Sequence, residues 1–146
     1  MIVDIRAERE QAGLTQVELA TLAGVAPSNL SAVEAGRRTA SPRLVERLRR
    51  AMRRPSRALA DHVNEVRQLV ERCGAENPRV FGSAAAGSDR PGSDLDLLVR
   101  VPPENAWRFV ALRPALVELL GVEVDVVSEG GLTDRHRRIL ESAVPL

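Results

Sequence analysis

The sequence has 146 residues and a mass of 15.9 kDa, which is enough for one ordinary domain or two small ones. Apolar residues make up 44% of it and charged residues 28%, a composition typical of globular rather than disordered proteins. No apolar run approaches the roughly 18 residues of a membrane span, and the N-terminus lacks a signal-peptide pattern. We therefore expect a cytoplasmic protein with no membrane partner.

The residues that the sequence lacks exclude several catalytic chemistries. All 21 basic residues are arginine, which excludes a P-loop lysine, a pyridoxal Schiff base and a lysine nucleophile. The single Cys73 excludes an internal disulfide and a multi-cysteine zinc site, and the distant His62 and His136 argue against a His-rich metal site or a Ser–His–Asp triad. Any chemistry must therefore use carboxylates, hydroxyls, arginines and backbone groups.

Charge is divided unevenly along the chain. Residues 1–60 carry 11 arginines and 6 acidic residues, a balance of +5, whereas residues 61–146 carry 10 arginines and 14 acidic residues, a balance of −4. Two halves of opposite charge indicate two modules with different partners. Pro55 stops one helix and Ser56 can begin the next, so we predict domains over residues 1–54 and 57–146.

The basic half has the pattern of several short helices. Residues 15–18 have the spacing of a capping box, and Gly24 fits the turn that ends the helix which follows. Pro27 suits the first position of the next helix, and Ser41 can cap another. Helices this short are unstable singly and must share a core. Its expected members are Leu14, Leu19, Ala20, Val25, Leu30, Val33 and Leu44.

Two helices of about eight residues around a turn at Gly24 form a helix-turn-helix. The run from Leu14 to Arg38 resembles the Cro/repressor-type DNA-binding family, and the resemblance covers roughly residues 4–53. It implies that the second helix of the pair enters the major groove and that Gln16, Arg37 and Arg38 contact phosphates. The residues it places at base edges are Ala26, Pro27, Ser28, Asn29, Ser31 and Ala32.

This set of base-contacting residues contains no arginine or glutamine for a bidentate base contact. We therefore expect modest sequence discrimination, with the affinity for operator DNA drawn from arginine–phosphate contacts and from dimerisation. The alternative is a helical packing module in which the arginines form only a solvated face.

The acidic half places carboxylates on predicted strands. A short β-prone run, residues 79–81, ends at a Gly-Ser turn, and residues 94–99 alternate so that Asp94 and Asp96 share one face. Residues 122–127 alternate in the same way and bring Asp125 to the acidic face of a neighbouring strand. Carboxylates this close repel each other unless a cation lies among them.

Oxygen ligands without histidine or cysteine suit Mg²⁺. The small turn at Gly82 and Ser83 lets backbone N–H groups approach and bind phosphate oxygens. Together these features are typical of two-metal phosphoryl transfer, in which one carboxylate also helps to deprotonate the attacking hydroxyl.

Phe81-Gly82-Ser83, followed after ten residues by Asp94-Leu95-Asp96, resembles the minimal nucleotidyltransferase family of the DNA polymerase β superfamily. Residues 124–127 match its third-carboxylate strand. The resemblance implies a small mixed-sheet α/β domain, so the whole chain is expected to be α+β with an all-α N-terminal domain. It also implies ATP or another nucleoside triphosphate as substrate. The implied ligands of two Mg²⁺ ions are Asp94, Asp96 and Asp125, and the implied phosphate ligands are Gly82, Ser83 and Ser93.

One position departs from the family. Many members carry an arginine in the turn after Gly-Ser, where this sequence has Ala84 and Ala86. Whether Arg79 or Arg90 replaces that cation is left open by the sequence, and a domain without turnover is the alternative. Further on, helical spacing predicts that residues 107–120 form a core helix, and residues 132–146 are expected to form a polar-faced helix.

Minimal nucleotidyltransferases and repressor-type domains both occur in antitoxins, so the resemblance implies an antitoxin with two activities. Residues 1–54 would repress its own operon, as a homodimer on palindromic operator DNA. Residues 57–146 would transfer AMP to a hydroxyl of the cognate toxin, a HEPN ribonuclease or a nucleotidyltransferase. The alternatives are a transcriptional regulator with a catalytically inactive nucleotide-sensing domain, and a small-molecule nucleotidyltransferase, for which the chain is short.

Overall fold

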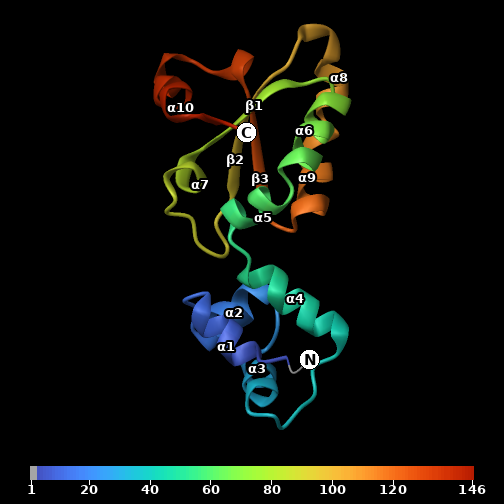
Figure 1. Cartoon of the computed structure of the whole chain (residues 1–146), viewed down its shortest axis with the longest axis vertical. Coiled ribbons are helices and arrows are strands. Elements are labelled where there is room, and N and C mark those ends of the chain that lie inside the picture. The colour runs from blue at the N-terminus through green and yellow to red at the C-terminus, as the bar shows by residue number, and fades with distance from the viewer. Residues whose placement is uncertain (1–2) are drawn as a thin grey trace. The chain divides into compact units, whose positions relative to one another are not determined.

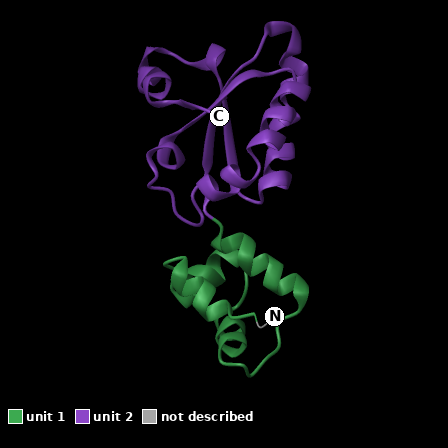
Figure 2. Ribbon diagram, in the orientation of Figure 1, with its two compact units in different colours: residues 1–53 green, residues 54–146 purple. Residues whose placement is uncertain are grey.

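The computed structural model describes residues 3–146 and divides the chain into two compact units, residues 1–53 and 54–146 (Figure 2). Each unit has a hydrophobic core of its own. No helix in the described residues combines the length and the apolar character needed to cross a membrane.

The described part of the first unit is helical (Figure 1). Its helices are α1 (Ile5–Gln11), α2 (Gln16–Ala23), α3 (Pro27–Glu34) and α4 (Pro42–Met52). The predicted capping box is confirmed, because the Glu18 N–H donates to Thr15 Oγ1 at 3.2 Å and the Thr15 N–H donates to Glu18 Oε2 at 2.7 Å. Gly24 adopts the left-handed conformation that turns the chain from α2 towards α3.

The core of this unit contains every predicted member, with Leu19, Leu30 and their neighbours buried and Val25, Val33 and Leu44 packed at its margin. Beside it lies a polar cluster that the sequence did not indicate. The guanidinium of Arg9 forms two bonds to the Glu34 carboxylate, at 2.7 and 3.0 Å, and Gln16 donates to the same carboxylate at 2.7 Å. The Glu34 side chain is only 3% exposed. The hydrogen bond from Arg9 lowers the pKa of Glu34 despite this burial.

The second unit is a mixed sheet with helices. Its strands are β1 (Glu76–Phe81), β2 (Leu95–Arg100), β3 (Val124–Ser128) and β4 (Val144–Pro145). Its α-helices are α5 (Pro55–Asp61), α6 (Val63–Arg72), α7 (Gly82–Ala86), α8 (Ala106–Phe109), α9 (Leu112–Leu120) and α10 (Arg137–Ser142). The strand order is β3-β2-β1-β4, with β2 parallel to β3 and β1 antiparallel to both of its neighbours. The α+β class is therefore confirmed.

The two faces of this sheet differ in chemistry. Leu95, Leu97 and Val99 on β2 are fully buried and share a core with the inward residues of α6 and α9, which lie along one side of the sheet in Figure 1. Because side chains alternate along a strand, Asp96 projects from the opposite face. The apolar face therefore provides the packing that holds the acidic face in place.

Two predictions for the second unit were wrong. The predicted helix over residues 107–120 is two helices, and Trp107 and Val110 are each 75% exposed, although Leu116 and Leu120 are buried as expected. Within the short α8, Phe109 packs at the margin of the core, whereas Trp107 does not. Residues 132–146 form an α-helix only over α10, after a short 3-10 turn at Asp134–His136. The residue before Pro145 favours an extended backbone, and Val144–Pro145 form β4.

The Glu34 cluster predicts a specific loss of stability. Replacing Glu34 by alanine removes the carboxylate that binds the buried Arg9 guanidinium at two atoms and leaves it the Leu14 carbonyl and the more distant Glu10, so Glu34→Ala should lower the free energy of unfolding by about 3 kcal/mol. Glu46→Ala, which removes an exposed carboxylate from α4, should change it by less than about 0.5 kcal/mol. Urea unfolding of the whole chain, with hydrogen exchange resolved to α1 and α3, measures both.

The difference in stability between the wild type and Glu34→Ala should also depend on pH. Because the pKa of Glu34 is lowered on folding, the ionised carboxylate adds to the free energy of unfolding above its unfolded-state pKa. This stabilisation is lost as the pH falls through its folded-state pKa. The difference between wild type and Glu34→Ala should therefore narrow in acid. A difference that stays constant down to the pH of acid unfolding would contradict this assignment.

Candidate functional site

The register of the sheet brings three carboxylates to one edge. Asp96 on β2 is paired with Asp125 on β3 and with Phe81 on β1. Paired residues on neighbouring strands share a face, and Asp94, two residues before Asp96, lies on that face as well. The predicted residues Asp94, Asp96 and Asp125 thus lie together where β2 and β3 begin.

The charges of these residues act on one another. Asp96 is partly buried, whereas Asp94 and Asp125 are exposed. Burial raises the pKa of Asp96, and the negative charges of Asp125 and Asp94 raise it further. Within residues 3–146, no three His, Cys, Asp or Glu side chains are already positioned as ligands of one metal ion. The oxygen-only donor set and its mutual repulsion nevertheless have the chemistry that suits a hard divalent cation.

Glycine is required where β1 meets α7. Gly82 has a φ of +68°, and a Cβ built on it would lie 2.4 Å from Oδ2 of Asp96. A side chain here would collide with the carboxylate as well as strain the backbone. The absence of a side chain lets the first turn of α7, which contains the partly buried Ser83, lie directly against the acidic edge.

The loop from α7 to β2 is fixed by a residue that the sequence analysis passed over. The Asp89 carboxylate, only 3% exposed, accepts a hydrogen bond from the Ser56 N–H at 2.7 Å and one from Arg54 at 2.9 Å. Burial opposes the ionisation of Asp89, but these bonds outweigh it and lower its pKa. Because both partners lie more than 30 residues earlier, no local pattern could have revealed this anchor.

The same loop ends in a closed turn directly before the acidic edge. The Arg90 N–H donates to Ser93 Oγ at 3.0 Å, and the Ser93 N–H donates back to the Arg90 carbonyl at 2.9 Å. The Ser93 hydroxyl therefore helps to shape the turn as an acceptor and keeps its own proton for donation to a ligand.

Arg79, one of the two candidates for a cation at this site, is engaged elsewhere. Its guanidinium forms an ion pair with Glu129, and its Nε donates to the Asn77 carbonyl at 3.1 Å. Arg79 pairs with Leu98, further along β2 than Asp96, and Glu129 follows the far end of β3. The Arg79 guanidinium is therefore committed to Glu129, beyond the end of β3 opposite to Asp125.

In the first unit, the residues predicted to contact DNA differ in how available they are. Pro27, Ser28, Asn29, Ser31 and Ala32 all lie on α3. Ser28 is exposed, as are Arg37 and Arg38 just after the helix, and within the described residues neither guanidinium has a partner. By contrast, the Gln16 amide is bonded to Glu34, and Oδ1 of Asn29 is buried with no hydrogen-bond partner in the part of the chain described.

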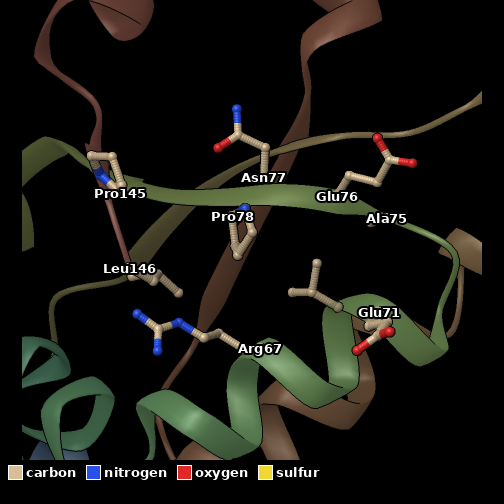
Figure 3. Close-up of a pocket in the computed structure, with 9 residues that line it drawn as sticks. Arg67, Glu71, Ala75, Glu76, Asn77, Pro78, Pro145 and Leu146 are labelled. Atoms are coloured by element: carbon tan, nitrogen blue, oxygen red, sulfur yellow. The ribbon is translucent and has the colours of Figure 1, made fainter.

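A separate hollow of about 360 Å³ lies between α6 and the edge formed by β1 and β4 (Figure 3). Arg67 and Glu71 of α6 line one side of it, and Asn77, Pro78 and Leu146 line the other. It contains none of the predicted site residues.

Comparison with known proteins matches two family models to successive parts of the chain. Residues 5–59 match the helix-turn-helix family model, and residues 59–146 match the nucleotidyltransferase domain model. This chain belongs to the nucleotidyltransferase domain family. It is 36% identical over 69 residues to the protein adenylyltransferase MntA of Thermococcus cleftensis, a match that covers 45% of this chain and 68% of that protein.

A solved structure provisionally described as a minimal nucleotidyltransferase is 44% identical and matches with a TM-score of 0.57, over 62% of this chain and 95% of that one. The predicted combination of an N-terminal helix-turn-helix and a nucleotidyltransferase domain is thereby confirmed. The chain is therefore a nucleotidyltransferase.

The close approach of Gly82 to Asp96 can be tested with a matched pair of variants. Gly82→Ala and Gly87→Ala both place alanine at a positive φ, so each should lose about 1–2 kcal/mol of stability. Only Gly82→Ala introduces a collision, because a Cβ at Gly87 meets nothing within 4 Å. We expect Gly82→Ala to weaken the binding of a nucleoside triphosphate by about tenfold or more, as measured by calorimetry, and Gly87→Ala to leave it unchanged. Equal affinities for the two variants would contradict the placement of phosphates at this turn.

Proposed function

We propose that this chain is an antitoxin that inactivates its cognate toxin by transferring AMP from ATP to a toxin hydroxyl, and that represses its own operon. The observation that carries the proposal is the juxtaposition of Gly82 with the three-carboxylate edge, in a chain that also contains a helix-turn-helix. The similarity to a protein adenylyltransferase supports AMP as the group and a protein as the acceptor.

Different residues at this edge would bind the phosphates and the metal ions. The backbone N–H groups of Gly82 and Ser83 and the hydroxyl of Ser93 would donate hydrogen bonds to phosphate oxygens. Asp94, Asp96 and Asp125 would hold Mg²⁺, with two ions during turnover. When bound, Mg²⁺ supplies positive charge that offsets the carboxylates and the charge developing on the phosphates.

The transfer itself exchanges one P–O bond for another. The acceptor oxygen forms a bond to the α-phosphorus, the bond from that phosphorus to the bridging oxygen breaks, and diphosphate leaves with the electron pair. We assign the acceptor proton to Asp125, because β3 is the outer strand of the sheet and its exposed carboxylate borders the surface from which an acceptor can approach.

The first unit supplies the second activity. Ser28 on α3 and the arginines at positions 37 and 38, which have no partner among residues 3–146, form an exposed set suited to operator DNA, with the arginines on phosphates. A homodimer would match the twofold symmetry of a palindromic operator. The toxin classes that fit are a HEPN ribonuclease and a nucleotidyltransferase.

A second function is favoured by Ala84 and Ala86, which stand where many family members have an arginine. A site with weaker phosphate binding and no turnover would make the chain a transcriptional regulator that senses nucleotide. The two functions differ in whether the toxin is covalently changed.

Intact-mass spectrometry of the toxin separates the two functions. The product of the neighbouring gene, co-expressed with the wild type, should gain the mass of one or more adenylyl groups. It should gain none with the Asp94→Asn, Asp96→Asn double variant, and the full increment with the control Asp134→Asn, which changes an exposed carboxylate on another segment. An unmodified toxin that still co-purifies with the wild type would leave the nucleotide-sensing regulator as the function.

The DNA contacts are tested through their salt dependence. Arg37→Ala combined with Arg38→Ala should weaken binding to the DNA upstream of the gene and reduce the slope of log K against log salt by roughly one per lost phosphate contact. Arg67→Ala, which removes an exposed arginine from α6, should leave the slope unchanged. A slope unaffected by the double substitution would remove both arginines from the interface.

A further inference from the structure

We propose that Arg90 supplies the positive charge that holds the triphosphate, in the role that Ala84 and Ala86 cannot perform. The inference rests on the proposed function, because it concerns the binding of the nucleotide at the same acidic edge. The Arg90 side chain, which lies outside the turn at Gly82 and Ser83, would bind the two terminal phosphates of the substrate.

The backbone that carries Arg90 is fixed on both sides. Before it, the Ser88 N–H donates to the Ser83 carbonyl at 3.0 Å, which ties the loop to the phosphate-binding turn. The buried Asp89 is then held by Ser56 and Arg54. After it, the two bonds between Arg90 and Ser93 close the turn. Arg90 therefore starts from a defined position between the phosphate-binding turn and Asp94.

The Arg90 guanidinium is available to a ligand in the described structure. Arg90 is exposed, and within residues 3–146 its side chain has no ion-pair or hydrogen-bond partner. Arg54 and Arg79 are bonded to Asp89 and Glu129, and Arg113 donates to the Val124 carbonyl at 2.9 Å. Arg90 therefore differs from these other arginines near the acidic edge. Its backbone is held by hydrogen bonds, and its guanidinium has no partner among the described residues.

Distance and chemistry favour a phosphate ligand. In a closed four-residue turn the first and last Cα atoms lie within about 7 Å of each other, so Arg90 begins close to Ser93 and Asp94. A long arginine side chain spans such a distance, and its planar guanidinium forms paired bonds to phosphate oxygens. Gly82 and Ser83 bind from the backbone side, so Arg90 would complete the contacts from the loop side.

The rival cations are Arg135, Arg137 and Arg138, which lie in the segment of η3 (Asp134–His136) and α10 and are also exposed. Helix α10 contacts α7, which places this segment near the phosphate-binding turn. Unlike residues 88–93, their segment forms no hydrogen bond to α7 or β2 within the described residues. They provide matched variants for the test.

Calorimetric titration of the full-length protein with ATP, ADP and AMP in Mg²⁺, without an acceptor, tests the assignment. Arg90→Ala should weaken ATP binding by about 10- to 100-fold, the loss expected for a charge-assisted contact, and AMP binding by less than about twofold. Arg90→Lys should restore part of the ATP affinity, since it keeps the charge but not the paired geometry. Arg67→Ala should match the wild type, and thermal unfolding should be the same for all of these variants.

Three results would overturn the proposal, and they are distinguishable. If Arg90→Ala binds ATP as the wild type does while Arg138→Ala does not, the cation lies on α10. If Arg90→Ala weakens AMP as much as ATP, the side chain shapes the site and does not hold the diphosphate end. If the wild type binds no nucleotide, the proposed function fails together with this assignment.

Discussion

The pairing of Asp96 with Phe81 on one side and Asp125 on the other is the constraint on which the site depends. A shift of one residue in either pairing would move every side chain of that strand to the opposite face, removing a carboxylate from the edge and breaking the contact with Gly82. The register is held from the other face, where Leu95 and Leu97 are buried against α6 and α9. Burial of that apolar surface offsets the cost of partly burying Asp96 beside the charges of Asp125 and Asp94, the burial and the charges that together raise the pKa of Asp96.

Each unit is also tied together by one buried carboxylate. Glu34 joins α3 to α1 and α2 through Arg9 and Gln16, and Asp89 joins the loop before β2 to the start of α5 through Arg54 and Ser56. In both cases an arginine compensates a charge that burial alone would make unfavourable. The second anchor has the clearer consequence for the proposed function, because it fixes the loop that carries Ser93 and Asp94, the residues that we propose bind the substrate.

The sequence revealed what local patterns encode. Capping residues and the turn glycine predicted α2, α3 and α4. The alternation of apolar and acidic residues correctly predicted that Asp96 and Asp125 share one face of the sheet. The sequence did not predict the long-range polar contacts, because Glu34 and Asp89 bind partners 18 to 35 residues away in the chain. Helical spacing also failed for Trp107 and Val110, because spacing identifies a possible face but not whether another element packs against it. The β4 pairing with β1 depends in the same way on tertiary contacts.

A chain without lysine must use arginine both for structure and for its ligands, and the contacts of each arginine separate the two uses. Arg9, Arg54 and Arg79 are bound to carboxylates and connect secondary-structure elements. Arg37, Arg38 and Arg90 are exposed, and their guanidinium groups have no partner within the described residues. An exposed guanidinium stays charged at any physiological pH, and its planar donor arrangement matches phosphate. The two proposed ligands, operator DNA and a nucleoside triphosphate, both present phosphates. We therefore assign each ligand to the arginines that have no partner among residues 3–146, in the unit whose other residues fit that ligand.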